Sequence, residues 1–177
     1  MGLFDFLKSG GKERPEEKTA PAVPPTAFPE TLGAPAKGTF VPMERLPDEV
    51  FSTGVLGMCC GVDPEEGRVY APADGTISQL TDTLHAVGLT AGGVEILIHV
   101  GVDTVEMNGE GFRNAVELDQ VVMRGELLLT MDLEKIKAAG HPATVIMAVT
   151  NSDDFTSLEA VGSGQVQPGD PVLRIRS

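Results

Sequence analysis

The stretch GVEILIHVGVDTV (residues 93–105) places a histidine, His99, at the end of a short unbroken apolar run. Three aliphatic residues precede the histidine, two of them isoleucine, and β-branched residues in so short a run favour a buried strand over a surface helix. Gly101 leaves room for close approach to the backbone or for an unusual φ angle. The stretch therefore predicts a histidine held at the end of a rigid strand, just before a glycine.

The chain from residue 38 onward has the pattern of an all-β domain, because short apolar runs alternate with Gly, Pro, Asn and Asp. The expected strands cover residues 38–41, 54–58, 68–71, 75–79, 86–89, 95–100, 120–123, 127–131, 144–149 and 172–176. Asp132 and Gly140 are suited to cap a short helix between them, and residues 151–160 allow a further helical turn.

A weak internal repeat relates residues 122–129 to residues 166–173, since each reads as strand, Gly–acid turn and strand. Two copies indicate a pseudo-symmetric β structure and not a solenoid, which needs at least three repeats. The sequence therefore predicts an antiparallel β-sandwich or flattened barrel with one or two short helices.

Composition narrows the class of protein. The 177 residues suit one domain, and with no Trp and one Tyr its core must be filled by aliphatic side chains. The net charge of −13 argues against nucleic acid as a partner and suits docking onto basic protein surfaces. No apolar run approaches the length of a membrane span, and no secretory signal is recognisable.

The chain has two cysteines, Cys59 and Cys60, which are adjacent and too few for a disulfide framework. Strand alternation would send one inward and the other outward. We interpret them as small strand residues of a protein in a reducing cytoplasm, in preference to a redox or metal role.

The N-terminal region divides into two parts. Residues 1–9 predict a short amphipathic segment in which Leu3, Phe4 and Leu7 share a face and Lys8 is basic. Residues 2–8 could lie on an anionic membrane surface, although a frayed tail or a partner-docking peptide fits as well. Residues 10–37, rich in Pro and Glu, predict a disordered linker, so the expected folded domain is 38–177.

Three histidines, His85, His99 and His141, are the candidates for chemistry. A neutral imidazole is a nucleophile suited to carry a phosphoryl group near neutral pH. Gly92-Gly93 lies between two strand-like runs, and a chain reversal there would bring His85 close to His99. His141 follows the short helix, where it can interact with the last carbonyls, and is interpreted as structural.

Residues 93–105 resemble, position for position, the phosphorylation-site pattern of the glucose-type enzyme IIA proteins of the bacterial sugar phosphotransferase system. Residues 71–77, 106–112 and 171–176 resemble the same family, and the similarity covers residues 38–176. This resemblance implies a duplicated hybrid motif of the barrel-sandwich type and a phosphotransferase component that requires no cofactor.

The resemblance also implies roles for individual residues. His99 corresponds to the residue phosphorylated through Nε2, and His85 to its supporting neighbour. Thr83 matches a threonine of the same hydrogen-bond network, and it can orient His85 if both point to one side of a strand. The implied relay takes phosphate from the phosphocarrier HPr and passes it to a cysteine in the IIB domain of a sugar permease.

Partner docking is expected around the two histidines. Asp48 and Asp103 match acidic positions that, in the family, meet arginine on HPr. An apolar rim that excludes water from the phosphohistidine is expected from Phe51, Leu56, Leu97 and Val105.

Two other classes of function remain open. A zinc-dependent hydrolase of similar fold would use His85, His99 and a carboxylate, although the His-x-His pair usual in such peptidases is absent. The two histidines could also bind an adventitious or interface zinc ion. A biotinyl- or lipoyl-like carrier would need a lysine at a hairpin tip flanked by Met, which the sequence lacks.

The domain is expected in the cytoplasm, peripheral to the inner face of the plasma membrane if residues 2–8 bind lipid. Unphosphorylated members of the family in some bacteria bind and inhibit permeases or kinases, so the resemblance leaves regulatory binding open as a second role.

Overall fold

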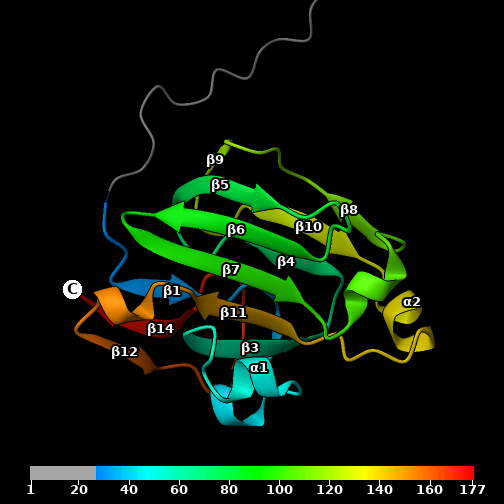
Figure 1. Cartoon of the computed structure of the whole chain (residues 1–177), viewed down its shortest axis with the longest axis horizontal. Coiled ribbons are helices and arrows are strands. Elements are labelled where there is room, and N and C mark those ends of the chain that lie inside the picture. Colours follow the sequence, from blue (N-terminus) through cyan, green and yellow to red (C-terminus); the bar gives the residue numbers. More distant parts are fainter. Residues whose placement is uncertain (1–26) are drawn as a thin grey trace, which may run out of the picture.

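The computed structural model describes residues 27–177, which form fourteen strands and five short helical segments (Figure 1). The strands are β1 (Thr31–Gly33), β2 (Gly38–Pro42), β3 (Met58–Pro64), β4 (Arg68–Tyr70), β5 (Gly75–Leu80), β6 (Ala86–Ala91), β7 (Val94–Val100), β8 (Phe112–Asn114), β9 (Val121–Val122), β10 (Leu127–Met131), β11 (Val145–Val149), β12 (Ser157–Ala160), β13 (Gln165–Val166) and β14 (Pro171–Arg176). The helical segments are η2 (Met43–Arg45), α1 (Glu49–Ser52), η3 (Thr104–Met107), α2 (Leu133–Ala138) and η4 (Ser152–Asp154). The predicted all-β class with short helices is confirmed.

The strands form one large sheet and two small ones, and all the pairings are antiparallel. The eight-stranded sheet has the order β13-β2-β3-β11-β7-β6-β5-β9, and the two three-stranded sheets are β1-β14-β12 and β4-β10-β8. Figure 1 shows β4 and β10 behind the layer that contains β5, β6 and β7. The main core lies between these layers and is built almost wholly from aliphatic side chains.

The fold is two copies of one strand unit. Read from its two ends, the large sheet places β13, β2, β3 and β11 in the same relation as β9, β5, β6 and β7. The cross-strand registers agree, because Val166 pairs with Gly38 as Val122 pairs with Gly75. The predicted repeat of residues 122–129 in residues 166–173 is therefore confirmed as β9–β10 and β13–β14.

A second repeat, in residues 34–39 and 71–76, reads Ala-Pro-Ala-x-Gly-Thr in both copies. Reciprocal hydrogen bonds join the two copies near these segments. The N–H of Gly33 donates to the carbonyl of Pro72 (2.8 Å), and the N–H of Tyr70 donates to that of Pro35 (2.8 Å). The first copy of this repeat lies partly inside the region expected to be a linker.

Residues 30–37 correct the predicted linker boundary, because they belong to the fold. β1 pairs with β14, and the side chains of Leu32, Ala34 and Ala36 are fully buried. Proline and small residues serve here as packed edge structure, which composition alone cannot distinguish from a disordered linker. The predicted amphipathic segment 1–9 and most of the linker lie outside the described residues.

One predicted element is wrong. Residues 54–57 form a turn after α1, so the strand expected at residues 54–58 begins only at Met58. The helical turn expected within residues 151–160 is present as η4, but it is followed there by a strand, β12, that the polar sequence did not predict. The predicted α2 is confirmed: the Asp132 carboxylate accepts hydrogen bonds from the N–H groups of Glu134 and Lys135.

A second, smaller core lies on the outer face of the large sheet. The segment η2–α1 covers the β3–β11 half of that face and buries Leu46 and Phe51 against Ile146 and Ala148. On the neighbouring half, only the five-residue connection 81–85 joins β5 to β6. The duplication is therefore broken on this face, and β7 lies at the border between its covered and uncovered halves.

The two cysteines lie on opposite faces of β3, as the alternation predicted. Cys60 packs into the main core and Cys59 into the second core, so both are fully buried. Burial raises the pKa of the Cys59 thiol to about 11 and raises that of Cys60 as well. Neither thiol forms a thiolate at neutral pH, which agrees with their interpretation as small packing residues.

The β6–β7 connection is a two-residue hairpin turn at Gly92 and Gly93, whose φ angles are +52° and +87°. Positive φ at both positions is the requirement of the tight turns that match strand twist. The predicted chain reversal is confirmed. Among the helices in residues 27–177, none has both the length and the apolar character needed to span a membrane.

Candidate active site

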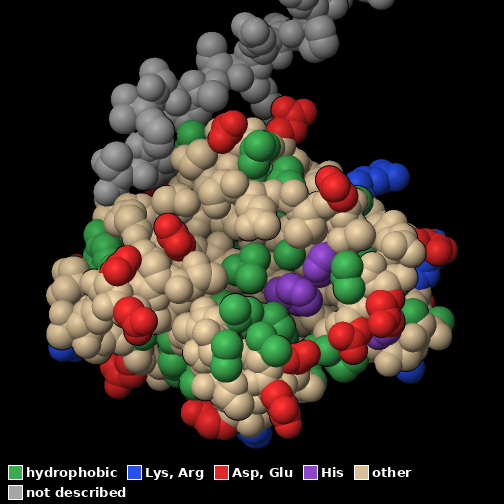
Figure 2. Space-filling model, viewed as in Figure 1, with side chains coloured by type: hydrophobic (Ala, Val, Ile, Leu, Met, Phe, Trp, Pro, Cys, Tyr) green, Lys and Arg blue, Asp and Glu red, His purple; other side chains and the backbone are tan. Residues whose placement is uncertain are grey.

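His85 and His99 lie side by side where β6 begins and β7 ends. Ala86 is the cross-strand partner of His99, and the Val100 N–H donates to the His85 carbonyl (2.7 Å). The two imidazole centroids are 4.9 Å apart with an interplanar angle of 78°. Figure 2 shows two histidines together at the surface, with apolar side chains around them and acidic side chains nearby. The predicted juxtaposition is confirmed.

The tautomer of His99 is set by the backbone. Its Nδ1 lies 2.8 Å from the carbonyl oxygen of Gly101, which can only accept a hydrogen bond. In the neutral ring, Nδ1 therefore carries the proton and Nε2 keeps its lone pair. His99 is half-buried, so this nucleophilic nitrogen is available at a partly exposed site.

Gly101 can adopt this position only because it lacks a side chain. Its φ is +72°, and a β-carbon there would lie 2.5 Å from Thr104 Cγ2 and 2.6 Å from the Pro142 carbonyl oxygen. The sequence indicated either a close approach to the backbone or an unusual φ angle at Gly101, and the structure has both.

Gly101→Ala is expected to destabilise the protein by about 3 kcal/mol or more, because a left-handed backbone penalty and two steric overlaps combine. The matched control is Gly125→Ala, since φ at Gly125 is +86° with no atom near its missing β-carbon. The free energy of unfolding of that variant should fall only by the backbone penalty, about 1–2 kcal/mol. Urea unfolding of both variants measures the difference, and equal losses would contradict the steric account.

His85 is oriented by Thr83, whose Oγ1 lies 2.7 Å from the His85 Nδ1. The predicted contact is present, but the predicted strand is wrong. Both residues belong to the turn before β6, and Leu84 between them has φ +61°. When the hydroxyl donates to Nδ1, the proton of His85 is on Nε2, where it can be donated to a neighbouring group.

Both imidazoles are neutral near pH 7. Burial lowers the pKa of His99, and this outweighs the opposing influence of the Gly101 carbonyl and of the Asp48 and Asp103 carboxylates. Burial also lowers the pKa of His85, and the neighbouring His99 lowers it further because two adjacent positive charges repel. A nucleophile and a hydrogen-bond donor, both uncharged, therefore face each other.

Phe51 is misplaced in the predicted docking rim. Phe51 belongs to α1, and its side chain is buried in the second core. Its ring centroid lies 5.2 Å from that of His99, with an interplanar angle of 51°. Phe51 thus forms a wall against the imidazole beneath the surface. The sequence could not show this, because the cover formed by α1 was not predicted.

The other predicted rim residues are at or near the surface. Val105 is exposed, whereas Leu56 and Leu97 are half-buried and pack against the second core. Asp103 is exposed, and Asp48 caps α1 by accepting a hydrogen bond from the Val50 N–H (2.7 Å). Asp48 therefore has a local structural role, and its docking role stays a prediction together with those of the other rim residues.

His141 lies after α2 and outside the histidine pair. Its backbone N–H, and not its ring, bonds the Ile136 carbonyl (3.2 Å). Its Nε2 is 3.7 Å from a Glu106 carboxylate oxygen on η3. These contacts fit the structural interpretation of this residue.

The zinc-hydrolase alternative requires a third ligand beside the two histidines. Within residues 27–177, no group of three or more His, Cys, Asp or Glu side chains is placed to hold a metal ion. That alternative therefore gains no support from the arrangement of the site.

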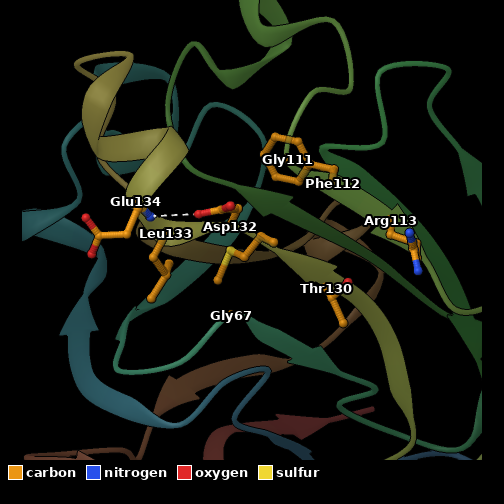
Figure 3. A pocket seen from close by; sticks show the side chains of 9 residues that line it. Gly67, Gly111, Phe112, Arg113, Thr130, Asp132, Leu133 and Glu134 are labelled. Carbon is orange, nitrogen blue, oxygen red and sulfur yellow. Dashed lines mark hydrogen bonds between the residues drawn. The ribbon is translucent and has the colours of Figure 1, made fainter.

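A shallow depression between β8, β10 and the start of α2 lies on another part of the surface (Figure 3). Glu134 and Arg113 lie at opposite ends of it, and its lining contains neither histidine nor cysteine. The depression therefore has no imidazole or thiol that could act as a nucleophile, and the histidine pair remains the candidate active site.

One part of the site was missed from the sequence. The Thr104 side chain is fully buried beneath the loop that carries the Gly101 carbonyl. Thr104 is a fixed position of the phosphorylation-site pattern that residues 93–105 resemble, but that resemblance gave it no role.

Comparisons with known proteins identify the family to which the chain belongs. The profile of the phosphoenolpyruvate-dependent sugar phosphotransferase system, EIIA 1, matches residues 30–155. The beta-glucoside-specific EIIBCA component from Dickeya chrysanthemi is 42% identical over 147 residues, 82% of this chain and 23% of that protein. The glucosamine-specific EIICBA component from Bacillus subtilis is 47% identical over 133 residues, 73% of this chain and 21% of that one.

A solved structure of a IIA protein is similar to this chain in both fold and sequence. Glucose permease IIA from Mycoplasma capricolum matches with a TM-score of 0.73 and 35% identity, covering 81% of this chain and 93% of that one. The chain thus spans less than a quarter of the multidomain relatives, at 23% and 21% of their length, but almost all of an isolated IIA structure. The chain belongs to the EIIA 1 family of the phosphoenolpyruvate-dependent sugar phosphotransferase system.

Proposed function

We propose that His99 accepts a phosphoryl group from phosphorylated HPr and passes it to the IIB domain of a sugar permease. The observation that carries this proposal is the Nε2 of His99, which is left with its lone pair by the Nδ1 contact to Gly101. The neighbouring His85 ring, 4.9 Å away, supplies the second group that such a transfer needs.

The chemistry requires no redox step. The lone pair of His99 Nε2 attacks phosphorus, the bond from phosphorus to the HPr imidazole breaks, and its electron pair returns to that imidazole. The resulting phosphohistidine is then attacked by a IIB thiolate, and the electron pair of the N–P bond returns to His99. In the onward step to IIB, the His85 Nε2–H donates to a phosphoryl oxygen and stabilises the developing charge.

The proposed partners fit the molecule. IIB and IIC domains appear in the names of the multidomain relatives, which supports a IIB domain as the acceptor. The chain carries a net charge of −13, and acidic Asp48 and Asp103 lie beside His99. Such a surface favours a donor with a basic docking face, as proposed for HPr.

Reconstitution tests this function directly. The full chain is incubated with labelled phosphoenolpyruvate, enzyme I and HPr, and then with a purified IIB domain. We expect stoichiometric, acid-labile labelling of the chain that is discharged on addition of IIB. A chain that stays unlabelled while HPr is fully phosphorylated would contradict the proposal.

The pH dependence of His99 follows from its surroundings. Because burial lowers the pKa of its imidazole below the ordinary 6.5, the nucleophilic neutral form should still predominate at that pH. Single-turnover phosphoryl uptake should therefore fall to half of its plateau value only below pH 6.5. NMR titration of the His99 ring checks the same point, and a midpoint above 6.5 would contradict it.

A further inference from the structure

In two consecutive peptide groups of the loop after β7, both the N–H and the carbonyl form hydrogen bonds. In the Val100–Gly101 peptide, the N–H of Gly101 donates to the Thr144 carbonyl (2.8 Å). The carbonyl of Val100 accepts a hydrogen bond from the Thr104 hydroxyl (2.5 Å).

The next peptide group presents the acceptor for His99. In the Gly101–Val102 peptide, the Val102 N–H donates to the Pro142 carbonyl (3.2 Å), and the Gly101 carbonyl faces His99 Nδ1 (2.8 Å). Four hydrogen bonds hold these two peptides, and one of them is made by His99 itself. Of the other three, only the bond from Thr104 comes from a side chain.

The Thr104 side chain is shaped for this place. It is fully buried, so an unmade hydroxyl bond there would be costly. Its methyl group occupies the space that a β-carbon on Gly101 would need. The hydroxyl thus holds one side of the Val100–Gly101 peptide while the methyl packs against the glycine.

We propose that Thr104 is a positioning residue, which fixes the Gly101 carbonyl and through it keeps the His99 proton on Nδ1. Without the hydroxyl bond the loop peptide can rotate, and the Gly101 carbonyl moves away from the ring. His99 then also populates the tautomer with its proton on Nε2, in which Nε2 has no lone pair to attack phosphorus. The rate consequence rests on the proposed function of His99, whereas the tautomer consequence does not.

Two pairs of side chains isolate the hydroxyl. In the first pair, wild-type Thr104 and Thr104→Val have the same branched shape and differ only in the hydroxyl. In the second pair, Thr104→Ser and Thr104→Ala both lack the methyl branch and again differ only in the hydroxyl. We expect only the hydroxyl-bearing members, Thr104 itself and Thr104→Ser, to keep His99 fully in the Nδ1–H form. The Ser and Ala variants decide the question if Thr104→Val does not fold.

The readouts are the ¹⁵N chemical shifts of the His99 ring and the single-turnover rate of phosphoryl uptake. The Val and Ala variants should show Nε2–H tautomer and uptake slower by about tenfold or more, because small displacements of a reacting group are costly in rate. The control is Ser152→Ala, which removes another hydroxyl bonded to a strand-end carbonyl, that of Val149 (2.5 Å), at the other end of the sheet. It should leave both readouts unchanged.

Folded Val and Ala variants with His99 entirely in the Nδ1–H form would overturn the proposal, whatever their rates. A rate loss that follows the missing methyl and not the missing hydroxyl would overturn it as well. If wild type takes up no phosphoryl group, the proposed function fails, and the ring shifts still decide the role of Thr104.

Discussion

His99→Ala is expected to abolish phosphoryl uptake from phosphorylated HPr, with a loss of more than about a thousandfold. The Gly101 carbonyl keeps the proton of His99 on Nδ1, so Nε2 of His99 has a free lone pair. The ring is partly exposed, so this nitrogen can act as the nucleophile. Labelling with phosphoenolpyruvate, enzyme I and HPr measures the loss.

His141→Ala is the matched control for that experiment. It removes a histidine that lies outside the pair and contacts Glu106, so uptake should equal that of wild type. Circular dichroism of both variants verifies the fold. Wild-type labelling of His99→Ala would remove His99 from the mechanism, and loss of labelling in His141→Ala would show that histidine removal disturbs the domain generally.

His85→Ala is expected to separate the two transfer steps. Its Nδ1 is held by Thr83, and its ring faces His99 edge-on at 4.9 Å, so it can donate to a phosphate but is not needed as nucleophile. Labelling of the variant should reach completion, whereas onward transfer to IIB should slow by about a hundredfold or more, since one positioned donor is lost. Rapid-quench kinetics of each half-reaction measure the split.

The conservative variant His85→Gln tests whether a hydrogen-bond donor is what His85 provides. A glutamine amide can donate at a place similar to that of the imidazole Nε2–H, so onward transfer should recover in part. Unimpaired transfer by His85→Ala would contradict the supporting role. Equal defects in the Ala and Gln variants would show that the ring matters by its shape or its titration and not as a donor.

Much of this molecule could be predicted from local sequence. The apolar run before His99, the Gly92-Gly93 reversal and the capping residues of α2 each act over a few residues, and each prediction is confirmed. The proximity of His85 and His99 followed from the hairpin alone, because adjacent antiparallel strands bring such positions together.

The remaining features depend on distant contacts. Leu32 and Ala34 are buried only because β1 finds β14 at the other end of the chain, so their Pro-rich surroundings looked like a linker. Phe51 became a wall of the site because α1 folds over β11, and nothing near Phe51 in sequence indicates that cover. The anchoring by Thr104 depends on a backbone geometry that appears only in three dimensions.

The site also shows how a duplicated fold can acquire one active centre. The two halves agree in strand order and in register, yet one outer face is covered by η2–α1 and the other is left open by a short turn. His99 on β7 shares its face with Ile146, its cross-strand partner, which is buried under that cover. The histidine pair therefore has a buried wall on one side and an uncovered sheet face on the other.

The site of phosphorylation can be measured directly in a ¹⁵N–³¹P correlation spectrum of the phosphorylated chain with ¹⁵N-labelled histidine. Because the Gly101 carbonyl occupies Nδ1 of His99, we expect a single N–P coupling, to Nε2 of His99. A coupling to Nδ1 of His99, or to either nitrogen of His85, would contradict this expectation.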